Sequence, residues 1–148
     1  MTILTFQSVG DFLQRFNGIF PGDNFGYVYA CEYGKDIKIG STQHPKQRIK
    51  SLESNARIYG NKKIGAIMIT PVGFMFYTDF ERFLHFIFED KRKSERGEVF
   101  DLTIKELEPV FITEFFSFLR FIESEVLKTT PGWNVMHKYI NHIRSCNG

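Results

Sequence analysis

The sequence predicts an α+β domain in which a small antiparallel sheet of about three strands is flanked by helices. Three observations lead to this prediction. The chain has 148 residues, the usual size of one domain. Two short segments with strand character are separated by a turn around Gly34, as in an antiparallel hairpin. Phenylalanine-rich segments further along repeat with the period of an amphipathic helix.

The predicted strands lie in the first two thirds of the chain. Residues 27–31 and 37–39 form the hairpin, and the second alternates apolar and polar side chains. Residues 64–69 are almost continuously apolar, which favours a central strand with both faces covered, ended by Pro71. Residues 98–102 are expected to be a short edge strand.

The predicted helices begin at recognisable signals. His44-Pro45 begins a basic helix that should end near residues 54–55. Residues 79–91 follow the 3.6-residue period. Thr103-x-x-Glu106 is a capping-box pattern that opens a helical region to about residue 128, and Pro109 should kink or divide it.

The chain is expected to have three parts. Residues 1–24 form an N-terminal helical appendage, with a short helix after Ser8 and a turn at residues 21–24. Residues 25–102 form the central domain. Residues 103–148 form a C-terminal helical extension on the same core. The Phe stripe from residue 111 to 122 is expected in the core, and a dimer surface is its alternative, so a homodimer stays open.

The composition is that of an intracellular protein. Cys31 and Cys146 are the only cysteines, too few for a disulfide framework or a zinc site. The first residues lack the pattern of a signal peptide, and no apolar run is long enough to span a bilayer. We therefore expect a cytoplasmic location, or a nuclear one in a eukaryotic host, and no membrane partner.

Positive charge is concentrated in one part of the chain. The net charge is +2, but residues 35–63 hold eight basic and two acidic residues. This favours contact with a polyanion, and a solvated helix face explains it equally well. The expected nucleic-acid contacts are Lys46, Arg48, Lys50, Lys62 and Lys63.

Four side chains in this order suggest phosphodiester chemistry. The hairpin carries the phenol of Tyr29 and the ammonium of Lys38, and the basic helix carries the guanidinium of Arg48. Glu81 supplies a carboxylate downstream. At 100° per residue, Glu81 and His85 share the edge of one apolar helical face, so both are expected to face a cleft beside the sheet.

These residues resemble the motifs of the GIY-YIG nuclease superfamily. Gly26-Tyr27-Val28-Tyr29 stands at the first motif, Ile37-Lys38-Ile39-Gly40 at the second, and Arg48 at the helical arginine. Glu81-x-x-Leu84-His85 and Gly97-Glu98-Val99-Phe100 resemble a branch of small phage and microbial proteins with E-x-x-L-H and G-E-W-F signatures. Lys38 replaces the second tyrosine, as is common in that branch, and Val99 replaces its tryptophan. The resemblance covers residues 25–102, which it identifies as a GIY-YIG-like nuclease domain.

The resemblance implies a metal-dependent DNA endonuclease. Tyr29 would be the general base, with its pKa lowered by Lys38. Arg48 would bind a non-bridging phosphate oxygen, and Glu81 would hold one Mg²⁺ or Mn²⁺. His85 would orient Glu81, bind phosphate or shuttle a proton. Tyr27 is a second candidate base, expected on the opposite face of its strand.

Each assignment has a structural alternative. Tyr29 could be an ordinary strand aromatic, Glu81 a carboxylate favoured by the helix dipole, and His85 a structural hydrogen-bonder. Glu98 is expected to be structural and to pair with the basic loop before it. A metal role for His137, His142 or Cys146 is not expected. The competing functions are a nucleic-acid-binding module that does not cut and, third, a protein-interaction domain.

Overall fold

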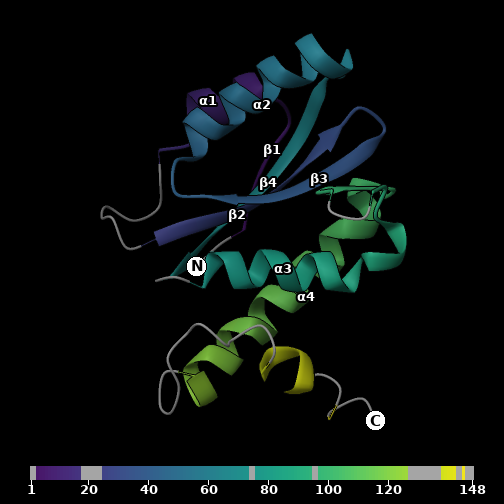
Figure 1. Cartoon of the computed structure of the whole chain (residues 1–148). Coiled ribbons are helices and arrows are strands. Elements are labelled where there is room, and N and C mark those ends of the chain that lie inside the picture. Colours follow the sequence, from purple (N-terminus) through teal and green to yellow (C-terminus); the bar gives the residue numbers. More distant parts are fainter. Residues whose placement is uncertain are drawn as a thin grey trace.

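The computed structural model describes residues 3–17, 25–73, 76–94, 97–126, 138–142 and 145. The turn predicted at residues 21–24 lies outside these ranges, as do His137 and Cys146. The α+β class is confirmed: one antiparallel sheet is covered by helices on both faces (Figure 1). The sheet has five strands rather than about three, in the order β1-β4-β2-β3-β5. The strands are β1 (Leu4–Phe6), β2 (Phe25–Tyr33), β3 (Asp36–Thr42), β4 (Ile64–Gly73) and β5 (Val99–Phe100).

The helices form two layers, one on each face of the sheet. In Figure 1, α1 (Val9–Arg15) and α2 (Pro45–Gly60) lie above the sheet. Below it lie α3 (Tyr77–Ile87) and α4 (Ile104–Phe121). A short 3₁₀ helix, Glu89–Lys91, follows α3, and a π-helical turn, Ile122–Val126, extends α4.

Strand alternation separates the core into two clusters. Val28 and Ala30 of β2 face α3 and α4, whereas Tyr29 and Cys31 face α1 and α2. The larger cluster contains Phe111, and it also holds the other rings of its Phe stripe, which confirms that stripe as core. Each face of the central strands is therefore fixed by its own set of apolar contacts.

The N-terminal segment contributes a strand as well as the predicted helix. Ser8 caps α1 by accepting a hydrogen bond from the backbone N–H of Asp11. Before it, β1 pairs antiparallel with β4, with Leu4 opposite Ile69. This three-residue strand was not predicted, because it is too short to show a period.

β4 is central, as predicted, because β1 and β2 pair with its two edges. The prediction that Pro71 ends it was wrong, since β4 continues to Gly73 and Pro71 pairs with Tyr27. β1 ends opposite Leu4's partner, Ile69, so beyond that point the proline's missing N–H can face an unpaired edge.

Two helices differ from their predicted lengths. α2 does not end near residues 54–55 but continues to Gly60, because Ala56 packs in the core and Asn61 ends the helix with a φ of 48°. Pro109 does not divide α4, which runs unbroken from Ile104 to Phe121. The capping box at Thr103 and Glu106 is confirmed.

Among the described residues, no helix has both the length and the apolar character needed to cross a bilayer.

Burial of Asp79 gives the first testable prediction. The residue is 8% exposed in the first turn of α3, and burial raises its pKa to about 6. The folded state therefore holds a proton more tightly than the unfolded chain, and this stabilisation is lost as pH rises through about 6. Asp79→Asn removes the titration. Between pH 4 and pH 8, wild type should lose about 1–2 kcal/mol more stability than the variant, measured by urea unfolding. Parallel pH curves would contradict this.

The close packing of Gly40 against Tyr29 gives a second prediction. The two residues are directly opposite each other on β3 and β2. A Cβ at Gly40 would lie 2.5 Å from the Tyr29 hydroxyl oxygen, too close for the ring to stay in place. Gly40→Ala should therefore cost about 1–3 kcal/mol in urea unfolding. Gly10→Ala is the control, because its nearest atom lies 3.8 Å away on an exposed helix, and it should stabilise slightly. Equal effects would contradict the prediction.

Candidate functional site

The candidate site lies at one end of β3, where the sheet edge is open. β5 pairs only with Ile37 and Lys38 of β3, and the N–H of Ile39 donates to the carbonyl of Glu98 just before β5. Within the described part of the chain, no strand pairs with β3 on that side from Gly40 to Thr42. Side chains from both faces of the sheet can therefore meet at this edge.

α3 brings a carboxylate, an imidazole and a strand hydroxyl together at this edge. Ser41 donates its hydroxyl hydrogen to Oε1 of Glu81, and Nε2 of His85 lies 3.5 Å from Oε2 of Glu81. Nε2 of His85 also lies 3.0 Å from the carbonyl oxygen of Ile39. A carbonyl only accepts, so Nε2 carries the hydrogen and Nδ1 keeps a lone pair. Glu81 and His85 face the sheet edge, as their shared helical face predicted.

Burial opposes charge on both groups of this cluster. The side chains of Glu81 and His85 are 13% and 12% exposed. Desolvation raises the pKa of Glu81, which the hydrogen bond from Ser41 partly offsets. Desolvation likewise lowers the pKa of His85, so the imidazole is neutral near pH 7. His85 is thus suited to hold Glu81 in place rather than to supply a positive charge.

Tyr29 approaches the edge from the other face and is 1% exposed. Burial raises the pKa of its phenol, and the nearby charge of Arg48 only partly opposes this. The prediction that Lys38 lowers the pKa of Tyr29 was therefore wrong in direction. The reason is that desolvation of a phenol in a packed core outweighs the one favourable charge near it.

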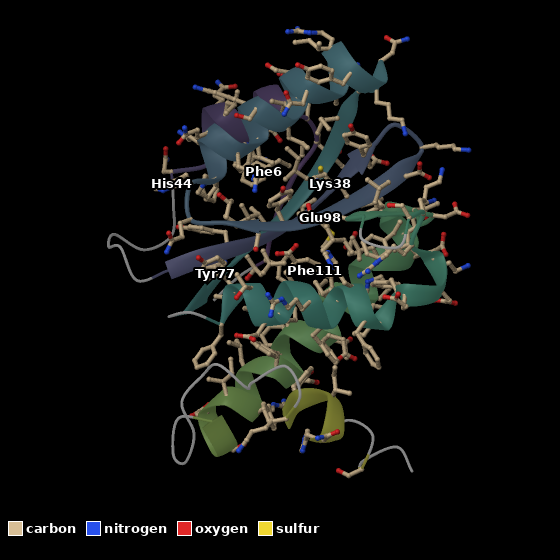
Figure 2. The ribbon with its side chains drawn as sticks, in the orientation of Figure 1. Phe6, Lys38, His44, Tyr77, Glu98 and Phe111 are labelled. Carbon is tan, nitrogen blue, oxygen red and sulfur yellow. The ribbon has the colours of Figure 1, made fainter. Side chains whose placement is uncertain are left out.

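Lys38 is held by an acid from the other end of the domain. Its Nζ lies 2.7 Å from Oε2 of Glu98, and Figure 2 shows the two side by side at the sheet edge. The lysine side chain is 18% exposed and that of Glu98 is 44% exposed. Glu98 was expected to pair with the basic loop before it, and that was wrong: its ion pair is with Lys38, 60 residues earlier.

Arg48 lies on the exposed surface of α2, above the same end of β3. Within the described residues, no side chain forms an ion pair with its guanidinium. It borders an open pocket of about 280 Å³. The pocket is lined by Thr42, His44, Gln47, Arg48 and Ser51. A free guanidinium beside a polar hollow is a suitable place for a phosphate oxygen.

The charges of the two faces act on each other. Arg48, Glu98 and Glu81 all influence the pKa of Tyr29. Glu98 and Lys38 influence Glu81, and they influence His85 in the same senses. The sequence-predicted groups from β2, β3, α2 and α3 thus lie within electrostatic reach of one another around the open end of β3.

Tyr27 does not lie on the opposite face from Tyr29. Residues two apart in a strand share a face, and both tyrosines pack in the cluster beneath α1 and α2. Tyr27 is 6% exposed, and its ring packs edge-on against Phe16 at 5.6 Å. It lies two residues further from Lys38 along the sheet and is anchored toward α1.

The basic residues predicted to bind nucleic acid do not form one cluster. Lys46 and Lys50 are exposed near the start of α2, close to Arg48. Lys62 lies beyond the far end of this helix, roughly 24 Å long, where its Nζ is 3.9 Å from Asp36 and 5.2 Å from the ring centre of Tyr33. Lys63 is exposed beside it. Two patches at the ends of α2 therefore replace the single one expected.

The oxygen donors at the site fit a divalent metal only in a minimal way. The described residues include no group of three or more His, Cys, Asp or Glu able to hold an ion. Glu81 offers one carboxylate, a hard donor of the kind that Mg²⁺ and Mn²⁺ prefer. A Mg²⁺ ion commonly uses one or two carboxylates together with water and phosphate oxygens, so this donor set is compatible with it.

Two residues of the cluster were missed as site residues. Ser41 was regarded only as part of the segment leaving the sheet, yet its position next to Gly40 places it opposite Glu81. Glu98 was regarded as structural. Its neighbour Gly97 and the short strand after it were the available signals, since they place an acid at the end of an edge strand.

Comparison with known families agrees with the extent of this unit. The model of the T5orf172 domain matches residues 26–116, which include β2 to β5 and every residue of the candidate site. No curated protein and no solved structure gave a significant match. T5orf172 domains are associated with endonuclease-like proteins, which supports a nuclease-like or nucleic-acid-binding role at a coarse level. With more than half of its residues matched by the family model, the chain belongs to the T5orf172 domain family.

Proposed function

We propose that this chain is a divalent-metal-dependent DNA endonuclease of the GIY-YIG type that hydrolyses phosphodiester bonds. The observation that carries the proposal is the meeting of side chains from both faces of the sheet at the open end of β3. Glu81 and His85 reach it from α3, and Tyr29, Lys38 and Arg48 reach it from the other layer.

Arg48 is the proposed phosphate ligand. Its planar guanidinium is free of ion pairs with described residues and can offer two parallel N–H donors to non-bridging oxygens. Such donors stabilise the negative charge that builds up on phosphorus-bound oxygens in the transition state. The polar hollow beside it leaves room for the backbone of a strand.

Glu81 is the proposed metal ligand, oriented by Ser41 and His85. A Mg²⁺ or Mn²⁺ ion bound there would supply Lewis-acid stabilisation of the leaving oxygen. His85 fixes one end of this arrangement through its hydrogen bond to the Ile39 carbonyl. Removal of His85 should therefore weaken the orientation of Glu81 more than it changes the charge of the site.

Tyr29 is the proposed general base, and its environment sets a condition on that role. In the free protein, burial keeps the phenol protonated at neutral pH. As a base it must pass on its own hydrogen while it accepts one from the attacking water, next to a bound phosphate. Its hydroxyl is held against Gly40, so its position is fixed before DNA arrives.

The test is cleavage of supercoiled plasmid by the purified protein in Mg²⁺. Tyr29→Phe, Arg48→Ala and Glu81→Ala should each lower the nicking rate by about 10²–10⁴. Lys105→Ala, an exposed residue on α4 in the opposite layer, is the matched control and should cut like wild type. If wild type and all variants are equally inert with either metal, the endonuclease proposal is refuted.

A nucleic-acid-binding module that does not cut is the second candidate. The raised pKa of Tyr29 and the ion pair of Lys38 favour it, because both groups are held in states that do not by themselves promote hydrolysis. The free Arg48 and the exposed lysines of α2 would serve binding alone equally well. Salt-sensitive DNA binding without metal-dependent nicking would support this function.

The position of the lysines predicts how DNA affinity depends on salt. Lys46 and Lys50 flank Arg48, so a double alanine variant should reduce the slope of log K against log salt by about 2. Replacing Lys62 and Lys63 should reduce it by about 1 or less, because Asp36 and Tyr33 already engage Lys62. Fluorescence anisotropy across a salt series measures both slopes. Equal losses would mean that DNA follows the whole length of α2.

A further inference from the structure

Glu98 belongs to the candidate site by geometry, although it was expected to be structural. It lies immediately before β5, where that strand ends and the open edge of β3 begins. Its backbone carbonyl accepts the N–H of Ile39, and its carboxylate accepts a hydrogen bond from Lys38 at 2.7 Å. Backbone and side chain of one residue thus bind two successive residues of β3.

We propose that Glu98 is a positioning residue of the nuclease site, which holds the ammonium of Lys38 at the open end of β3 for the substrate phosphate. This inference rests on the proposed function and deepens it. A lysine side chain has four rotatable carbons and loses much rotamer freedom when it is fixed. An ion pair with a partner anchored by its own backbone hydrogen bond removes that freedom before DNA binds.

The surroundings of Lys38 leave Glu98 as its partner among the described residues. Cys31 is directly opposite Lys38 on β2, and burial raises the pKa of that thiol to about 12, so it carries no charge at neutral pH. Glu81 lies on the other face of the sheet and is engaged by Ser41 and His85. Without Glu98, the ammonium would have no fixed acceptor in this part of the chain.

A double-mutant cycle separates this role from a structural one. Glu98→Gln keeps the shape of the side chain and the backbone bond to Ile39, but removes the charge. In the wild-type background it should lower kcat for plasmid nicking about tenfold, with KM changed less than about threefold. In a Lys38→Met background, the same substitution should change kcat less than about twofold, because the group through which Glu98 acts is absent.

Glu89→Gln is the matched control. Glu89 also pairs with a basic residue, Arg92 at 3.5 Å, in the segment before β5, but is 61% exposed and outside the site. It should leave kcat unchanged in both backgrounds. Thermal unfolding of every variant shows whether a loss of activity follows a loss of fold. Equal loss of kcat from Glu98→Gln in both backgrounds would overturn the inference, since it would show an effect independent of Lys38.

The same variants keep the inference testable if the protein binds DNA but does not cut it, which would refute the proposed function alone. The cycle is then read in DNA affinity by anisotropy. The change in Kd caused by Glu98→Gln should differ at least about threefold between the wild-type and Lys38→Met backgrounds. Identical changes would overturn the inference, and absence of DNA binding by wild type would overturn both proposals.

Discussion

The short length of β5 is the constraint on which the candidate site depends. A strand of only two residues covers the first part of the β3 edge and leaves the rest open. The carbonyl of Ile39 then accepts a hydrogen bond from His85, a side chain of α3, rather than from a further strand. Had β5 continued, its backbone would have occupied this position, and the groups of α3 would have been separated from those of the other layer. An edge strand that stops early therefore makes an edge accessible where a longer one would have protected it.

The two faces of the sheet contribute groups of different character. On the face of α2, Tyr29 is packed under the helix, and the missing side chain of Gly40 leaves space for its hydroxyl. On the other face, Glu81 and His85 are mostly shielded, and each has a partner. Arg48 alone of the basic site residues is both exposed and without an ion pair to a described side chain. A phosphate that enters this site would meet the guanidinium first, because the other groups are already bound within the protein.

Much of this arrangement could be predicted from the sequence, and the remainder depends on tertiary contacts. The hairpin, the helix after Pro45 and the shared face of Glu81 and His85 follow from local periods of two and 3.6 residues. β1 and the path of β4 through Pro71 do not, since both depend on which strands pair at the edges. The partner of Lys38 was missed for the same reason: 60 residues separate it from Glu98, and no local pattern relates them. The pKa of Tyr29 was misjudged because the sequence shows which charges are near a group but not how deeply the group is buried.

Replacement of the second-motif tyrosine by Lys38 changes the electrostatics of the site less than the sequence suggests. A lysine adds a full positive charge, but Glu98 lies 2.7 Å from it and offsets that charge. The influence of Glu98 on Tyr29 is to raise the pKa of the phenol, whereas that of Arg48 is to lower it. In the free protein the ammonium therefore supplies a fixed donor position more than a net field. The field that an entering phosphate experiences comes chiefly from Arg48 and the exposed lysines near it, which are screened by salt, whereas the position of Lys38 is set by a short hydrogen bond that salt affects much less. Binding of DNA and the geometry of its attack should for this reason depend on different residues of one site.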